Sequence, residues 1–296
     1  MKKWVIAGIG AWLGGAIILF IVFGNEGKND AFKPQDEFQL HPWIPIHIGG
    51  LDLSINRAVL YLFIACAFTC WAMVYIAKRM QDRPNRVQTA VEAVYDFARR
   101  DIVSTNMDEK MATKWFATVA TLFFFIWFSN LLGYIPLPTS HEKINIFGIN
   151  FPAFAIYAAT ANISVPLVLT LFVWFSYHWE GIRAQGVVGY FKSWIPSGVE
   201  GFARIPIFII EVISHFVRLI SLSVRLFANM LAGHLLILFM GGGLVVLLGI
   251  AAIGWLTAPM AIAFFIFEVG LVATLQAFIF ATLTSIYLGG ATAEHH

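Results

Sequence analysis

Long apolar runs recur along this sequence and constrain its fold more than any other feature. A helix of about 20 apolar residues crosses the hydrocarbon core of a membrane. Closed barrels also satisfy their backbone polar groups there, but their strands give short segments of alternating polarity. With 59% hydrophobic and 12% charged residues, the chain is predicted to be an all-α polytopic membrane protein with about five to six membrane helices. The runs are Trp4–Phe23, about Ala58–Ala77, about Lys114–Tyr134, Phe151 to about Tyr177, about Phe202–Met240 and about Leu244–Leu288.

The last two runs are nearly twice as long as a vertical crossing requires. Helices of that length must tilt strongly or lie partly along the membrane. Gly241-Gly242-Gly243 separates the two runs and is predicted to supply the turn of a long C-terminal hairpin, residues 202–288. Pro166, inside the fourth run, predicts a kink in that helix.

The first run separates an N-terminal region from the rest of the chain. Lys2 and Lys3 precede it, as in a signal peptide, but no small-residue cleavage pattern follows Phe23. For residues 1–24 we therefore favour a retained hydrophobic anchor over a signal segment. Residues 25–56 are predicted to form an external loop, and residues 57–296 the main membrane domain.

The polar segment between the second and third runs is rich in basic residues, which places it in the cytoplasm by the positive-inside rule. These residues are Lys78, Arg79, Arg83, Arg86, Arg99, Arg100, Lys110 and Lys114. Apolar residues recur in the same segment at helical spacing, at Val87, Val91, Val94, Tyr95, Ala98 and Ile102. The pattern predicts an amphipathic cytoplasmic helix that lies at the membrane surface or against a partner; a solvated helical hairpin is the alternative.

Arg225 is the most anomalous residue of the sequence, because it lies inside the fifth apolar run. Its guanidinium stays protonated, and a charge near the bilayer centre costs about 2.5–3.5 kcal/mol even on lenient scales. Such a charge normally faces a partner or a water-filled path, so a functional site is predicted; ion pairing within a helix bundle is the alternative. On a helix, the residues that share a polar stripe with Arg225 are Glu211, Ser214, Arg218, Ser221 and Asn229.

His234 and Glu268 are ionisable residues of the hairpin that lie off this stripe. In an antiparallel hairpin the two side chains are expected to approach each other near the outer half of the membrane. A glutamate near a histidine in a water-filled cleft can exchange protons around neutral pH. Gln276 follows Glu268 by eight residues, so the two project about 80° apart on a regular helix.

The sequence contains no glycine-rich phosphate-binding loop, and it contains neither the HExxH motif nor the GxSxG motif of soluble enzymes. Cys66 and Cys70 predict neither a disulfide framework nor a metal site. We expect no cofactor, no metal, no nucleic-acid partner and no catalysis by this chain alone. A channel or secondary transporter, a redox-complex subunit and an intramembrane enzyme built on His234 and Glu268 remain as alternatives. The sequence shows no inverted repeat, which weakens the transporter alternative. Its histidines are not paired as haem ligands would be, which weakens the redox alternative.

Two segments of the chain closely resemble characteristic segments of subunit a of F-type ATP synthases. They are Ser221–His234 (SLSVRLFANMLAGH) and Leu275–Leu288 (LQAFIFATLTSIYL). Val87–Glu92 and Asn130–Pro136 are also similar to segments of that family. The resemblance extends from about Leu40 to the C-terminus and leaves the first apolar run outside.

The resemblance implies a role for several residues of this sequence. Arg225 would be the essential arginine between two half-channels, with Asn229 one turn beyond it and Gln276 positioning it from the facing helix. The ion path would also include His234 in the outer half-channel, Glu211 and Ser221 on the arginine helix, and Asn162 at a polar outer position.

The family has a second ionisable residue seven positions before the glutamine, which here is Val269. Glu268 lies one residue earlier, so either a local bulge restores the alignment or the partnership of His234 with Glu268 is altered.

The resemblance also implies a function. Subunit a stands beside a ring of c-subunits, each with one membrane-embedded carboxyl group, and two offset aqueous half-channels connect the ring to opposite sides of the membrane. The chain is therefore expected to be a proton-translocating stator subunit in a bacterial plasma membrane, with the c-ring, the b-subunit peripheral stalk and other synthase subunits as partners. A sodium-coupled version is the alternative. One charge that crosses 100 mV releases about 2.3 kcal/mol, so several crossings must be summed by rotation to make one ATP.

Overall fold

The computed structural model describes residues 2–24, 39–48, 51–52, 54–146, 149–195 and 201–292. Helices dominate this part of the chain, and five helical segments within it are long and apolar enough to cross a membrane. The predicted all-α membrane fold is therefore confirmed, and the chain is a multi-pass integral membrane protein. The five segments are Ile6–Phe23, Arg57–Arg79, Glu109–Leu132, Gly201–Leu248 and Ala251–Thr292.

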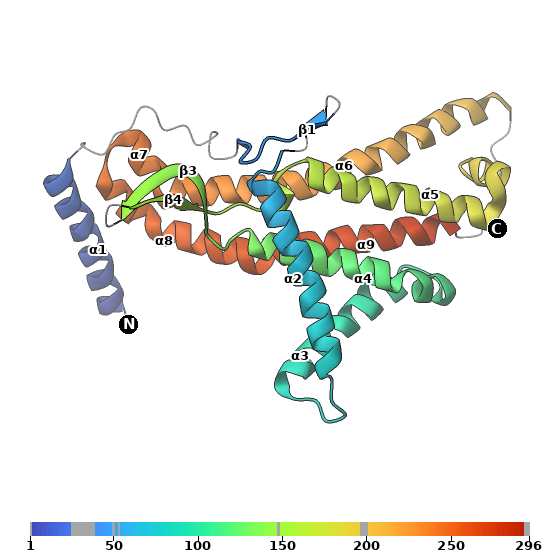
Figure 1. Cartoon of the computed structure of the whole chain (residues 1–296), viewed down its shortest axis with the longest axis horizontal. Coiled ribbons are helices and arrows are strands. Elements are labelled where there is room, and N and C mark those ends of the chain that lie inside the picture. Colours follow the sequence, from blue (N-terminus) through green and yellow to red (C-terminus); the bar gives the residue numbers. More distant parts are fainter. Residues whose placement is uncertain are drawn as a thin grey trace. The chain divides into compact units, whose positions relative to one another are not determined.

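The chain forms two compact units, of which unit 2 comprises Leu60–Leu132, Ala158–Ala228 and Ala273–His296. In unit 2, α4 and α5 both pack along α9 (Figure 1). Its elements are most of α2 (Arg57–Arg79), α3 (Arg86–Phe97), the π-helix η2 (Ala98–Ser104), α4 (Glu109–Leu132), the 3-10 helix η3 (Ala159–Ala161), α5 (Ser164–Ser193), the 3-10 helix η4 (Gly201–Ala203), most of α6 (Arg204–Leu238) and α9 (Ala273–Thr292).

Small side chains allow α9 to pack closely in the core of unit 2. Ala273, Ala277 and Ala281 are each 0% exposed. In lipid, helices associate where small residues permit close backbone approach, because apolar side chains gain little by leaving lipid for protein. Gly289 lies against the backbone of Asn106, and a methyl group in its place would collide with the Asn106 carbonyl oxygen.

Unit 1 comprises Met1–Val59, Gly133–Tyr157 and Asn229–Val272. Within this unit α1 packs against α8, and β1 with β2 and β3 with β4 form two antiparallel hairpins. Its elements are α1 (Lys2–Phe23), β1 (His47–Ile48), β2 (Leu51–Asp52), β3 (Leu137–Ile146), β4 (Ile149–Ala155), the end of α6, the π-helix η5 (Phe239–Gly243), α7 (Leu244–Leu248), α8 (Ala251–Phe267) and the π-helix η6 (Glu268–Val272).

The fourth predicted membrane segment, Phe151–Tyr177, is wrong in its first part. Its first residues lie in β4, and α5 begins only at Ser164, whose N–H donates to Oδ1 of Asn162 at 3.0 Å. Pro166 therefore lies in the first turn of α5, where its missing N–H leaves no helical hydrogen bond unmade, and it produces no kink. The backbone leaves helical geometry instead at Gly186, which has a φ of 74°. This left-handed conformation favours glycine.

The turn of the C-terminal hairpin also lies later than predicted. Gly241–Gly243 belongs to η5, which continues α6 without a break. The helix ends at Gly249, whose φ of 75° is left-handed. On the other side of the turn, the Thr257 hydroxyl donates to the Met240 carbonyl oxygen at 2.8 Å, which ties α8 to η5.

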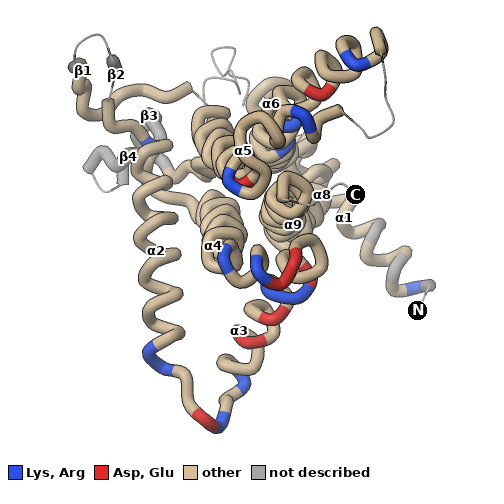
Figure 2. The backbone as a smooth tube through the Cα atoms, turned by 90° about the vertical axis from the view of Figure 1, so that its right-hand side faces the viewer, with Lys and Arg blue, Asp and Glu red and all other residues tan. Residues whose placement is uncertain are grey.

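The predicted amphipathic segment forms α3 followed by η2. Asn85 begins α3, since its Oδ1 accepts the N–H of Gln88 at 2.8 Å. None of the side chains of α3 is buried within the chain, so its contact with a membrane surface or a partner stays a prediction. Charged residues gather along α3 and η2 (Figure 2). Of the predicted external loop, residues 25–56, the structure describes 39–48, 51–52 and 54–56, and its external position stays a prediction.

Candidate functional site

Arg225 lies on an exposed face of α6 in unit 2. Leu222 and Leu226 of the same helix are 2% and 1% exposed, whereas Ser221 and Arg225 are exposed. The exposed residues form a shallow groove of ≈ 380 Å³. Within the described residues, the Arg225 guanidinium makes neither a hydrogen bond nor an ion pair. A permanent charge thus lies in an apolar surface, and the described residues give it no counter-charge. The groove is lined by Val217, Ile220, Ser221, Val224 and Arg225.

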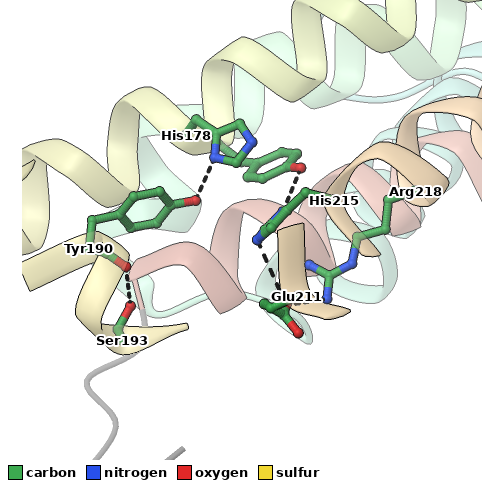
Figure 3. Close-up of polar contacts among 7 residues, drawn as sticks. His178, Tyr190, Ser193, Glu211, His215 and Arg218 are labelled. Carbon is green, nitrogen blue, oxygen red and sulfur yellow. Dashed lines mark hydrogen bonds and ion pairs between the residues drawn. The ribbon is translucent and has the colours of Figure 1, made fainter. Parts of the chain in front are cut away.

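Arg218, two turns earlier on α6, is paired. Its Nη2 lies 3.3 Å from Oε1 of Glu211, and its guanidinium lies over the ring of Tyr287, 5.7 Å from the centroid. Nε2 of His215 lies 3.7 Å from the same carboxylate oxygen (Figure 3). Among the described residues the two arginines of α6 therefore differ, because Arg218 has a carboxylate partner and Arg225 has none.

The polar cluster around Glu211 continues onto α5 (Figure 3). The Tyr177 hydroxyl lies 2.9 Å from Nδ1 of His215, and the Tyr190 hydroxyl lies 2.7 Å from Nδ1 of His178. Burial and the positive charge of Arg218 lower the pKa of His178 to about 4, and burial raises the pKa of Tyr190 to about 12. At neutral pH the phenol therefore donates to a neutral imidazole.

The two histidine rings of this cluster lie 4.8 Å apart, so the two hydrogen-bonded pairs adjoin. Across the described part of the chain, no group of three or more His, Cys, Asp and Glu side chains is arranged to hold a metal ion.

His234 and Glu268 lie in one cluster of unit 1. They are 0% and 8% exposed, and the Glu268 carboxylate lies against Gly233, where a methyl group would collide with it. In the described part of the chain no ion pair joins His234 directly to Glu268. Tyr134 contacts both, because its hydroxyl lies 3.1 Å from Oε2 of Glu268 and its ring stacks on that of His234 at 4.7 Å.

A local bulge accompanies the unusual position of Glu268. Residues Glu268–Val272 form the π-helix η6, and a π-helical turn takes up one extra residue relative to an α-helix. Glu268 and Gln276 are eight residues apart in the sequence, but because of the extra residue their relative position on the helix is that of residues seven apart in a regular α-helix. The backbone therefore contains the bulge that the first alternative requires. That it restores the family alignment of Glu268 stays a prediction.

For the remaining predicted residues, a direct interaction with Arg225 stays a prediction. Gln276 is 5% exposed within α9 and Asn229 is exposed on α6, but neither hydrogen-bonds to Arg225 in the described part of the chain. Asn162 accepts the N–H of Ser164, which is a helix-starting contact. Its place in an ion path stays a prediction.

Sequence reasoning missed several contributors to these clusters, among them His215, Tyr177 and Tyr134. His215 lies four residues after Glu211 on α6, a spacing that could have revealed it. Tyr177 and Tyr134 give no such signal, because their partners lie 38 and 134 residues away along the chain. Tyrosine is also common near membrane interfaces without any such role.

The chain was compared with known proteins. The model of the ATP synthase A chain family matches residues 59–289 and so leaves α1 outside. ATP synthase subunit a of Rubrobacter xylanophilus is 34% identical over 259 residues, which cover 84% of this chain and 92% of that protein. The subunit a proteins of Bradyrhizobium diazoefficiens and Pelagibacter ubique are each 34% identical, over 89% and 90% of this chain and 98% and 100% of their own lengths. The chain therefore belongs to the ATP synthase A chain family, as the resemblance in its sequence predicted.

Proposed function

We propose that this chain is the proton-translocating stator subunit in the membrane sector of a rotary ATP synthase of a bacterial plasma membrane. The observation that carries the proposal is the contrast between the two arginines of α6. Arg218 has a carboxylate partner at 3.3 Å, whereas Arg225 is exposed and has none among the described residues. A guanidinium on an apolar membrane face requires a counter-charge, and we infer that another molecule supplies it to Arg225.

A ring of c-subunits, each with a carboxyl group inside the membrane, would supply that counter-charge. The residues beside Arg225 suit contact with such helices, since Val217, Ile220 and Val224 are 53%, 57% and 41% exposed. An apolar face lets a helix slide past without forming fixed polar contacts. A peripheral stalk of b-subunits would hold this chain still while the ring turns.

Arg225 would act on each carboxyl group as it passes. A fixed cation favours the ionised form of a nearby carboxyl group, so the proton leaves as the group arrives. The same positive charge repels protons and prevents them from crossing directly from one access path to the other. Because arginine stays protonated, it cannot itself release or carry the proton.

The two access paths would lie on either side of Arg225 along α6. Glu211 precedes Arg225 by 14 residues and His234 follows it by nine, which correspond to about 21 Å and about 13 Å of helix rise. The cluster of Glu211, His215 and Tyr177 (Figure 3) would serve one path. His234 and Glu268 would serve the other.

The test is ATP-driven proton uptake into inverted membrane vesicles that contain the assembled complex. Arg225→Ala is expected to lower the uptake by about a hundredfold or more, because a preorganised charge is lost from the step in which a proton is released. Arg183→Ala removes a positive charge from an exposed position of α5 and should leave the uptake unchanged. Near-native uptake by Arg225→Ala vesicles with a normal amount of complex would overturn the role of Arg225.

The same vesicles decide which ion is coupled to ATP hydrolysis. Proton coupling predicts that a protonophore abolishes the gradient and that sodium is not needed. ATP-driven sodium uptake that increases with the protonophore would instead establish the sodium-coupled alternative.

A further inference from the structure

Tyr134 connects two titratable groups, His234 and Glu268, between which the described residues show no hydrogen bond or ion pair. It follows α4 in a turn and is 5% exposed. Its hydroxyl lies 3.1 Å from Oε2 of Glu268, and its ring lies almost parallel to that of His234, with centroids 4.7 Å apart and an angle of 23°. Phe265 meets the Tyr134 ring edge-on at 5.8 Å. The ring is thus held in place by its neighbours, and the hydroxyl is held in place with it.

The surroundings of His234 suit a ring that gains and loses a proton. Nδ1 lies 2.9 Å from the carbonyl oxygen of Met230, and Nε2 lies 3.3 Å from that of Gly133. Carbonyl oxygens only accept hydrogen bonds, and a neutral imidazole has a single N–H, so only the protonated ring donates to both. The face of Tyr134 would also attract a protonated ring through a cation–π contact. The turn that carries Tyr134 therefore contacts His234 through both its backbone and its side chain.

The position of the Glu268 carboxylate is closely defined by its neighbours. The carboxylate lies against the backbone of Gly233, where a Cβ would displace it, at the start of the π-helix η6. The Tyr134 hydroxyl is the hydrogen-bond donor that the described residues offer it. An ionised carboxylate accepts such a bond more strongly than a neutral acid does. Tyr134 therefore fixes where the carboxylate lies and favours its ionised form.

We propose that Tyr134 is a positioning residue of the ion path, which holds the Glu268 carboxylate through its hydroxyl and His234 through its ring so that the two exchange protons in one fixed arrangement. This inference rests on the proposed function, in which His234 and Glu268 carry protons. Tyr134 acts on the proton only through these two side chains, which are the titratable groups that face it from α6 and from η6.

The experiment compares variants of the assembled complex in inverted vesicles, with ATP-driven proton uptake measured across a range of pH. Tyr134→Phe keeps the ring and removes the hydroxyl. We expect it to lower the rate of uptake by about tenfold. This factor corresponds to the lower end of the free energy that a hydrogen bond to a charged group contributes. We also expect the acid limb of the pH profile to move to higher pH, because the ionised carboxylate has lost its donor. Tyr134→Leu removes the ring as well and should lower the uptake further.

Tyr75→Phe is the matched control, since it is the same chemical change at a tyrosine of α2 that is 42% exposed; its uptake and pH profile should be native. A native rate and native profile for Tyr134→Phe would overturn the inference. Failure of the Tyr134→Phe complex to assemble would also overturn it, because the hydroxyl would then serve the structure. Glu268→Gln separates the two proposals: if it pumps normally, the proposed path through Glu268 fails whatever Tyr134 does.

Discussion

Asn130 shows, at the scale of one residue, how a buried amide joins three elements of unit 2. It lies near the end of α4 and is 0% exposed. Its Nδ2 donates to the carbonyl oxygen of Ala273 at 3.2 Å, and its Oδ1 accepts the hydroxyl of Thr160 at 2.7 Å. Ala273 is the first residue of α9 after the π-helix η6, so the amide satisfies a carbonyl close to that irregular backbone.

Asn130→Ala should destabilise the complex. The change leaves a carbonyl and a hydroxyl buried without their partner, and each such group costs about 1–3 kcal/mol. We expect a lower midpoint of thermal unfolding for the purified complex. Ser129→Ala is the matched control, because the Ser129 hydroxyl is buried and makes no hydrogen bond among the described residues. Equal midpoints for the two variants would contradict the role given to Asn130.

The residues that sequence reasoning found and those that it missed differ in a physical way. Arg225 and Glu268 are charged residues inside apolar runs, and their cost in lipid makes them conspicuous without any knowledge of their neighbours. Asn130 and Tyr134 are neutral residues at the end of a membrane segment, where polar groups are common. Their importance comes from partners 143 and 134 residues away, which only the folded chain brings together.

At the scale of elements, α1 is the helix that the family match does not include. In unit 1 it packs along α8, where Nε1 of Trp255 donates to the carbonyl oxygen of Trp12 at 2.9 Å. Gly15 lies against the same indole, and a Cβ in its place would be 3.1 Å from Nε1. The contact ties α1 to α8 within unit 1. That residues 1–24 remain in the mature chain stays a prediction.

Gly15→Leu should therefore weaken the packing of α1. A bulky side chain at a tight contact typically costs about 1–3 kcal/mol, and it would also displace the Trp255 indole from its hydrogen bond. The midpoint of thermal unfolding of the complex should fall. Gly14→Leu is the matched control, since nothing lies within 4 Å of a Cβ placed at Gly14. If both variants unfold like the native chain, α1 does not depend on this contact.

Hydropathy predicted the existence of the membrane helices better than their ends and breaks. Apolar length alone identifies α2, α4 and the two C-terminal helical segments. It misplaced the start of α5, because an apolar strand and an apolar helix look alike over a few residues. It also assigned the hairpin turn to Gly241–Gly243, whereas glycine permits a turn without requiring one and the helix ends at Gly249.

At the scale of the whole molecule, the distribution of charge should determine which side of the membrane each segment occupies. Lys78 and Arg79 end α2, and charged residues continue along α3 and η2 (Figure 2). The positive-inside rule predicts that this segment lies in the cytoplasm. At 23 residues, α2 has a length of about 34 Å, enough for one crossing of a core about 30 Å thick. The residues before α2 should therefore lie outside.

Thiol labelling tests this arrangement with two single-cysteine variants. The native thiols Cys66 and Cys70 are both exposed within α2 and are first replaced by alanine. A membrane-impermeant maleimide should then label Asp82→Cys in inverted vesicles but not in intact spheroplasts, and it should label Trp43→Cys in spheroplasts but not in inverted vesicles. Each variant is the control for the other, because α2 alone separates the two positions. If both were labelled from the same side, α2 would not cross the membrane, and the cytoplasmic position of α3 could no longer be derived from its basic residues.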